Sequence, residues 1–255
     1  MDLPINHFKR ALREGRPQIG LWSHLCHPIS AEVLGHCGFD WMVLDMEHSP
    51  NELPEVLGQL QALGNSPTMP VVRPPWNDMV IFKRLLDIGA QTLIVPYIQN
   101  ADEARQAVAY TRYPPHGVRG YAGAPRASGY GRIKDYAKRC ADEICLLLQI
   151  ETLEGLKHLE AIAQIEGVDG VFIGPGDLSA DMGHLGNPKH PEVVAAVEDA
   201  FKRIRACGKA PGILTGDEAL ARHFIDIGGL FVAVGADQNL LRDSASALAA
   251  RFKAR

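Results

Sequence analysis

Two acidic residues, Glu151 and Asp177, follow two apolar segments, 144–150 and 170–175, that have the composition of buried strands. If these segments form neighbouring parallel strands, both carboxylates lie at the same edge of the sheet. Carboxylates without nearby Cys or His ligands suit Mg²⁺ or Mn²⁺, with water or substrate oxygens filling the remaining positions. Each residue alone could be a helix N-cap or a solvated acid. Their adjacency favours a metal site.

The turn Gly174-Pro175-Gly176-Asp177 opens a helical sequence. The first backbone N–H groups of a helix have no intrahelical partner, so those of Gly176 and Asp177 can bind a carboxylate or a phosphate. A plain N-cap role for Asp177 is the alternative, and the two roles are compatible.

Arg73 ends a third apolar segment and is followed by two prolines, which keep it out of a helix. A guanidinium at that position can bind an anion bidentately or balance the charge of an enolate. A buried ion pair with Asp45 or Glu47, which end another apolar segment, is the alternative.

His48 follows Asp45 and Glu47 directly, at the end of the segment 41–46. An imidazole held near carboxylates is suited to general base catalysis. Asp87 is a candidate partner that orients His48, although its place late in a helix also fits a surface residue. His24, Cys26 and His27 fit a pocket lining better than a zinc site, because no second ligand cluster accompanies them.

No lysine falls at the end of an apolar strand segment, where a Schiff-base amine would be needed. A carbanion formed in this protein is therefore expected to be stabilised by a metal ion rather than by an imine.

Eight short apolar segments carry these residues, and stretches with helical spacing of apolar residues separate them. Apolar character along nearly the whole of each segment is typical of parallel strands that are buried on both faces. Glycines at 38, 64, 89, 167, 208 and 228 are expected to end helices as C′ residues. This alternation predicts an α/β protein with a single (β/α)₈ barrel, with strands over 18–23, 41–46, 69–74, 92–98, 144–150, 170–175, 210–215 and 230–235. A doubly wound open sheet is the competing fold, but the glycine-rich first turn typical of such sheets is missing.

The composition sets limits on function. The chain has 255 residues, with 46% hydrophobic and 22% charged residues, as in a globular protein. With 26 basic and 30 acidic residues the net charge is −4, which does not favour nucleic acid or membrane surfaces as partners. Five scattered cysteines without a CxxC motif, and an N-terminus without the apolar stretch of a signal peptide, favour a single soluble domain in the cytoplasm.

Long segments of the chain resemble the HpcH/HpaI family of metal-dependent pyruvate aldolases, over about residues 5–252. The segments that carry the resemblance are GFDWMVLDMEHSPN, PVVRPPWND, RYPPHGVRG, QIETLEGL, EGVDGVFIGPGDLSADMGHLGNPKHPEV and GKAPGIL. The resemblance implies a TIM barrel, a divalent cation (Mg²⁺, Mn²⁺ or Co²⁺) and a homohexamer built as a trimer of dimers with the last helix exchanged between subunits.

The resemblance also implies the roles of individual residues. Glu151 and Asp177 would bind the metal, His48 would be the base with Asp87 as its partner, and Arg73 would steady an enolate. The amides of Gly176 and Asp177 would hold the carboxylate of pyruvate. The other expected substrate contacts are Trp22, Asp45, Gln149 and Leu214. The implied reaction is the reversible cleavage of a 4-hydroxy-2-oxo acid, expected to be 4-hydroxy-2-oxoheptanedioate, to pyruvate and an aldehyde such as succinic semialdehyde.

The segment 112–133 is too long for an ordinary connection and is expected to be functional or to lie between subunits. A dicarboxylate substrate needs a cation at its far end, and Arg119, Arg126 and Ser128 are the candidate contacts in this segment.

Alternative functions share the same enolate chemistry. They are cleavage of 2-dehydro-3-deoxyglucarate to pyruvate and tartronate semialdehyde, an acyl-CoA lyase of the citrate lyase β or malyl-CoA lyase type, and a reaction like that of macrophomate synthase. The acyl-CoA lyase would want a basic surface for the adenine nucleotide, which the sequence does not show. From another class, a barrel without activity could act as a binding protein, but it should then have lost Glu151, Asp177 or Arg73.

Overall fold

The computed structural model describes residues 1–253 and contains a closed barrel of eight parallel strands, in the order β1 to β8 along the chain. The prediction of a single (β/α)₈ barrel is thus confirmed. The strands are β1 Gln18–Ser23, β2 Trp41–Asp45, β3 Met69–Arg73, β4 Thr92–Val95, β5 Cys145–Ile150, β6 Gly170–Ile173, β7 Ala210–Leu214 and β8 Phe231–Ala236.

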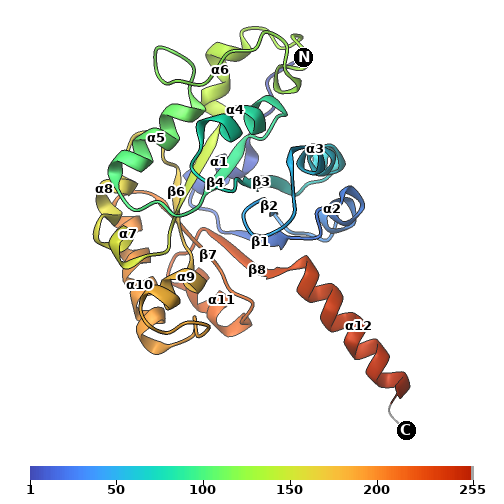
Figure 1. The fold of residues 1–255 in the computed structure, drawn as a ribbon, viewed down its shortest axis with the longest axis vertical. Helices are drawn as coiled ribbons and strands as arrows, with labels where there is room; N and C mark the ends of the chain where they lie inside the picture. The colour runs from blue at the N-terminus through green and yellow to red at the C-terminus, as the bar shows by residue number, and fades with distance from the viewer. Residues whose placement is uncertain (254–255) are drawn as a thin grey trace.

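Helices surround the barrel and connect consecutive strands (Figure 1). They are α1 His7–Arg13, α2 Pro28–Gly35, α3 Leu53–Ala62, α4 Met79–Asp87, α5 Ala101–Thr111, α6 Tyr136–Glu143, α7 Leu153–Lys157, α8 Leu159–Ala163, α9 Pro175–Asp181, α10 Pro191–Ala206, α11 Glu218–Asp226 and α12 Asp237–Lys253, with short 3₁₀ helices η1 Leu63–Asn65 and η2 Arg126–Ser128. None of the helices within residues 1–253 has the length and apolar character needed to cross a membrane.

The predicted strands agree with the structure to within one or two residues, apart from 92–98. Strand β4 ends at Val95 because Pro96 lacks an N–H group and Tyr97 adopts a left-handed conformation, with φ of 59°. Among the predicted helix-ending glycines, Gly64 is the exception: it lies inside η1 and lacks the positive φ of the others.

Two hydrophobic layers hold the barrel. One lies between the strands and the helices, and the other fills the barrel interior with large side chains such as Trp22, Trp41, Phe172 and Phe231. Helix α1 covers the end at which the strands begin, because its Phe8 packs 5.6 Å from the ring of Trp41, the first residue of β2. The opposite end, where the strands finish, is left open for a site.

Helix α12 leaves the body of the protein after β8 and projects away from it (Figure 1). Of its residues within the described chain, only Asp237 is buried, and it carries four exposed large apolar side chains: Leu240, Leu241, Leu248 and Phe252. An apolar face of this size on an isolated helix is typical of a surface that contacts another subunit.

The barrel interior depends on glycines beneath its large rings. A Cβ atom on Gly212 would lie 2.1 Å from the Phe231 ring. We therefore expect Gly212→Ala to reduce the free energy of unfolding, measured by urea denaturation, by about 1–3 kcal/mol, the usual cost of overpacking. Gly64→Ala is the matched control, since no atom lies within 4 Å of its added Cβ. Equal effects of the two substitutions would contradict this account of the barrel interior.

Candidate active site

A cavity of about 480 Å³ opens at the end of the barrel where the strands finish. Its volume lies in the range of small-molecule sites. Eight of the residues expected at the site line it: Trp22, His48, Arg73, Gln149, Glu151, Gly176, Asp177 and Leu214. Of His24, Cys26 and His27, which the sequence favoured as pocket lining, only His24 lines this cavity; His27 instead caps α2.

Arg73, the last residue of β3, lies in a buried network of charges. Its Nε and Nη2 atoms donate to the two carboxylate oxygens of Asp45, each at 2.7 Å, and its Nη1 lies 2.7 Å from Glu47 Oε2. The bidentate pair follows from strand register, because Asp45 and Arg73 are directly paired residues of β2 and β3. The ion pair that the sequence left as an alternative is therefore present, and the guanidinium still faces the cavity.

Asp45 is fully buried and remains a strong acid. Burial alone would raise its pKa, but hydrogen bonds from His24 and Arg73 outweigh that effect and hold the pKa well below its usual range. The His24 Nε2 atom lies 3.1 Å from Asp45 Oδ2. Asp45 thus does not itself line the cavity but fixes the positions of two side chains that do.

Glu151 follows β5 and is 1% exposed. The backbone N–H of Tyr97 donates to Oε1 at 2.9 Å, and the side-chain amide of Gln149 donates to Oε2. The left-handed backbone of Tyr97 is a conformation that costs energy in a non-glycine residue, and it lies directly beside this carboxylate. Hydrogen-bond donors from β5 and from the loop after β4 therefore hold the Glu151 carboxylate in position.

The carboxylates of the cavity carry more negative charge than their neighbours neutralise. Burial, followed by the charges of Glu47 and Asp177, raises the pKa of Glu151 to about 7. Burial also raises the pKa of Glu47 to about 7, despite the charge of Arg73. The Gln149 Oε1 atom is buried and accepts no hydrogen bond from the described part of the chain. Buried oxygen atoms with surplus negative charge are a donor set that fits a hard divalent cation.

Asp177 lies in the first turn of α9 and is exposed to the cavity. The N-cap of this helix is Gly174, so Asp177 does not have the plain N-cap role that the sequence left open. The carboxylate is therefore free to face Glu151 across the ends of β5 and β6, which are paired strands.

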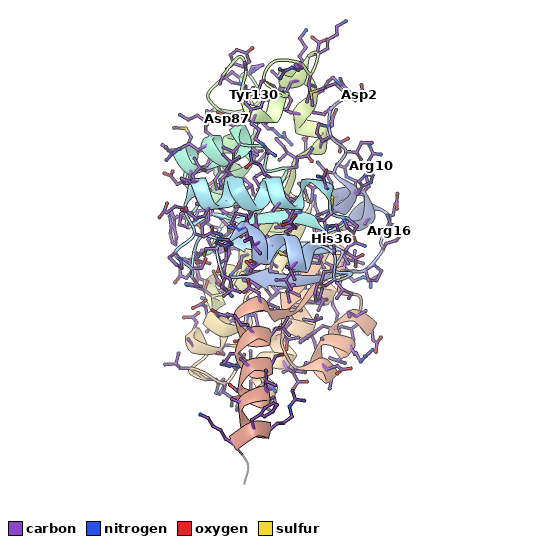
Figure 2. All side chains as sticks on the ribbon, turned by 90° about the vertical axis from the view of Figure 1, so that its right-hand side faces the viewer. Asp2, Arg10, Arg16, His36, Asp87 and Tyr130 are labelled. Carbon is purple, nitrogen blue, oxygen red and sulfur yellow. The ribbon has the colours of Figure 1, made fainter. Side chains whose placement is uncertain are left out.

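His48 lies on the loop after β2, with 61% of its side chain exposed and its Nε2 atom 3.8 Å from Glu47 Oε2. Asp87, labelled in Figure 2, is the last residue of α4. Its Oδ1 atom accepts a hydrogen bond of 2.8 Å from the buried Arg119. Since α4 runs back from the open end to the start of β4, Asp87 lies at the opposite end of the barrel from His48. One protomer does not bring the two together.

Arg126 and Ser128 also lie away from the cavity within one protomer. Arg126 Nη1 donates to the carbonyl oxygen of Ile88 at 2.6 Å, just after α4, and Ser128 Oγ donates to that of Pro125 at 2.8 Å. Both residues form η2, which contacts α4.

Sequence reasoning did not single out two further residues of the cavity, Lys189 and Asp217. They come from the loops after α9 and β7, and their side chains form an ion pair of 2.5 Å. Neither residue comes directly after a strand, so the positions of the strand ends do not predict that they line the cavity.

Comparisons with known proteins show which family the chain resembles. The model of the HpcH/HpaI aldolase/citrate lyase family matches residues 18–244. A 4-hydroxy-2-oxo-heptane-1,7-dioate aldolase of Klebsiella pneumoniae is 60% identical over 97% of this chain and 94% of its own length. One from Salmonella dublin is 59% identical over 98% of this chain and 95% of its own.

Solved structures give the same result. A HpcH/HpaI aldolase/citrate lyase family protein from Burkholderia cenocepacia is 39% identical with a TM-score of 0.93, covering 97% of this chain and 100% of that one. A HpcH/HpaI aldolase from Desulfitobacterium hafniense is 27% identical with a TM-score of 0.88, covering 97% of both chains.

The raised pKa of Glu151 predicts a cost in stability. Its folded-state pKa of about 7 lies above the ordinary 4.5, so the stability of the metal-free protein falls as the pH rises through that interval and stays low above it. At about 1.4 kcal/mol per pH unit, Glu151→Gln should raise the free energy of unfolding by up to about 3 kcal/mol at pH 8. The gain should vanish near pH 4.

Urea denaturation in the presence of a chelator measures this difference. Glu52→Gln, at an exposed glutamate, is the control and should change the free energy by less than about 0.5 kcal/mol. A loss of stability in Glu151→Gln at pH 8 would contradict the charge surplus.

Proposed function

Because the chain belongs to the HpcH/HpaI aldolase/citrate lyase family, we propose that its cavity cleaves 4-hydroxy-2-oxoheptanedioate to pyruvate and succinic semialdehyde. The chain is an enzyme, a carbon–carbon lyase of the class II pyruvate aldolase type. The observation that carries the proposed site is the surplus of buried carboxylate charge at Glu151, beside Asp177 and Arg73. A retro-aldol reaction that does not proceed through an imine can use this combination of a cation site and a fixed positive charge to stabilise the enolate.

We assign the divalent cation, Mg²⁺, Mn²⁺ or Co²⁺, to the carboxylates of Glu151 and Asp177. Such a cation supplies Lewis-acid polarisation of the 2-oxo group of the substrate. The donors from Tyr97 and Gln149 orient Glu151, which is the role that outer contacts commonly have around metal ligands.

The remaining residues of the cavity bind and orient the pyruvate half. The first-turn amides of Gly176 and Asp177 have no intrahelical acceptor and are available for the substrate carboxylate. Arg73, held in place by Asp45, stabilises the negative charge that develops on the enolate oxygen. Trp22, Gln149 and Leu214 line the space around it.

His48 acts as the base. It accepts the proton of the C4 hydroxyl, the C3–C4 bond breaks, and its electron pair passes into the enolate of pyruvate while the aldehyde leaves. The enolate then takes up a proton at C3 to give pyruvate. The exposure of His48 at the cavity allows the imidazole to reach the hydroxyl directly or through water.

We further propose a homohexamer built as a trimer of dimers, with α12 exchanged between subunits. The apolar residues of α12 support this arrangement, since Leu240, Leu241, Leu248 and Phe252 are exposed within one protomer. The position of Asp87 supports it as well: Asp87 can partner His48 only from another copy of the chain, and Arg126 and Ser128 can approach an aldehyde only in the same way. We place the enzyme in the reducing cytoplasm, where its five free thiols would persist.

Metal removal tests the cation site. Chelation should abolish cleavage, and Mn²⁺ or Mg²⁺ should restore it. Glu151→Gln and Asp177→Asn should raise the metal concentration needed for half-maximal activity by orders of magnitude, whereas Glu154→Gln, at an exposed neighbour, should not. Borohydride with pyruvate should trap no adduct, and a mass shift on any lysine would contradict the metal-dependent mechanism.

Substitution of His48 tests the base. His48→Ala should lower kcat by about 10²–10⁴, the usual effect of losing an acid–base group, with little change in metal affinity. The pH profile of the wild type should contain an ionisation that the variant lacks. His36→Ala, at an exposed histidine outside the cavity, is the control. If both His48→Ala and His48→Asn keep most of the activity and lose thermal stability instead, His48 is a packing residue.

A further inference from the structure

Lys189 places a positive charge at the mouth of the cavity. It lies on the loop between α9 and α10, and 62% of its side chain is exposed, compared with 1% of Glu151 at the inner end. The cavity therefore has a charged group at each end: carboxylates that suit a cation in the interior, and an ammonium group at the entrance.

Lys189 retains capacity for a further anion. Arg73 is assigned to the enolate and already directs three nitrogen atoms at Asp45 and Glu47, both buried or half-buried, so a second carboxylate on the substrate needs another cation. The ammonium group of Lys189 has three N–H donors, and Asp217 accepts one of them at 2.5 Å. Two donors remain for a ligand that enters the cavity.

Asp217 fixes the position of Lys189 from the other side of the entrance. It is the N-cap of α11, and its Oδ1 atom accepts a hydrogen bond of 3.1 Å from the amide of Leu220 while Oδ2 pairs with Lys189. The hydrogen bond from Lys189 is the main cause that lowers the pKa of Asp217, which remains an anion near neutral pH. The ion pair thus joins two loops at the entrance.

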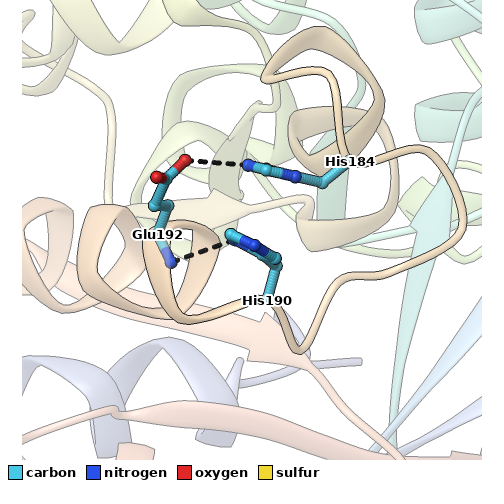
Figure 3. A group of neighbouring side chains, drawn as sticks. All are labelled: His184, His190 and Glu192. Carbon is cyan, nitrogen blue, oxygen red and sulfur yellow. Dashed lines mark hydrogen bonds and ion pairs between the residues drawn. The ribbon is translucent and has the colours of Figure 1, made fainter.

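A cluster of His184, His190 and Glu192 holds the loop that carries Lys189 (Figure 3). The two imidazole rings stack at 3.6 Å, His184 Nε2 lies 2.8 Å from Glu192 Oε2, and the Glu192 amide donates to His190 Nδ1 at 3.3 Å. Because Nδ1 accepts a hydrogen bond, neutral His190 carries its proton on Nε2 and has no free lone pair for a metal ion. These contacts therefore restrain His190, the residue next to Lys189.

Apolar side chains also line the cavity. Leu214, Leu220 and Val194 belong to this lining. They offer a surface for methylene groups but no partner for a charge. A substrate with carboxylates at both ends and methylenes between them matches this set of groups.

From these observations we propose that Lys189 binds the distal carboxylate of the substrate and thereby selects dicarboxylic 4-hydroxy-2-oxo acids over those that yield an uncharged aldehyde. This inference rests on the proposed function and adds a specificity-determining residue to it. Lys189 then supplies the cation for the far end of the substrate from the protomer that holds the rest of the cavity. Arg126 could supply one only from another subunit.

Kinetics with two substrates test the proposal. With 4-hydroxy-2-oxoheptanedioate, Lys189→Gln should lower kcat/KM about tenfold, mainly through KM, as expected for loss of a hydrogen bond to a charged group. With 4-hydroxy-2-oxopentanoate, which yields acetaldehyde, the change should be less than about twofold. Lys189→Arg should retain most of the discrimination because it keeps the charge.

The matched control is Lys202→Gln, at an exposed lysine of α10 outside the cavity, which should leave the ratio of the two substrates unchanged. Equal losses on both substrates in Lys189→Gln, or a loss of discrimination in Arg126→Gln but not in Lys189→Gln, would overturn the proposal. Exchange of the C3 protons of pyruvate in D₂O, followed by NMR, reports the pyruvate half separately and should be unaffected in Lys189→Gln. If the wild type neither exchanges these protons nor cleaves either substrate, the proposed function fails, not the assignment of Lys189.

Discussion

The site depends on an imbalance of buried charge. Asp45, Glu47 and Glu151 lie beside one guanidinium, that of Arg73, which makes its direct contacts with the first two. Glu151 is left with two neutral hydrogen-bond donors, which orient a carboxylate but do not balance its charge. A buried acid in this state is costly to fold and gains most from a cation. The structural cost and the proposed metal affinity are thus two consequences of the same arrangement.

The barrel maintains this arrangement through strand register rather than through flexible loops. Pairing of Asp45 with Arg73 across β2 and β3 produces their bidentate contact, and pairing of β5 with β6 brings the segments of Glu151 and Asp177 side by side. Gly174 supports the latter, because a Cβ atom there would lie 2.4 Å from Glu151 Oε2. A shift of one residue in the pairing of β2 with β3 would turn the side chain of Asp45 or Arg73 to the other face of the sheet.

The parts of the site that follow from strand order could be predicted from the sequence, and those that follow from loops could not. Arg73 ends β3, Glu151 follows β5 directly, and Asp177 lies in the helix that opens just after β6. The ends of parallel strands meet at one rim, so the proximity of these residues needed only the correct fold. Asp87 shows the limit of this reasoning: it ends α4, at the opposite end of the barrel from His48, so the proposed pairing of the two residues needs a second copy of the chain. Lys189 lies in a loop whose path depends on the contacts among His184, His190 and Glu192. Spacing along the chain does not reveal such contacts.

Residues positioned by the strands carry the chemistry of the enzyme, and residues positioned by the entrance loops carry its choice of substrate. Interior residues are fixed by pairing of β-strands and by buried ion pairs, so a substitution there disturbs both folding and the reaction. Lys189 and Asp217 are held by contacts between exposed loops, where an ion pair contributes little to stability. Residues at the entrance can therefore change with small cost to the fold, and a barrel with the same buried charges can take different aldehydes. The entrance loops, more than the strand ends, should determine which relatives of this enzyme share its substrate.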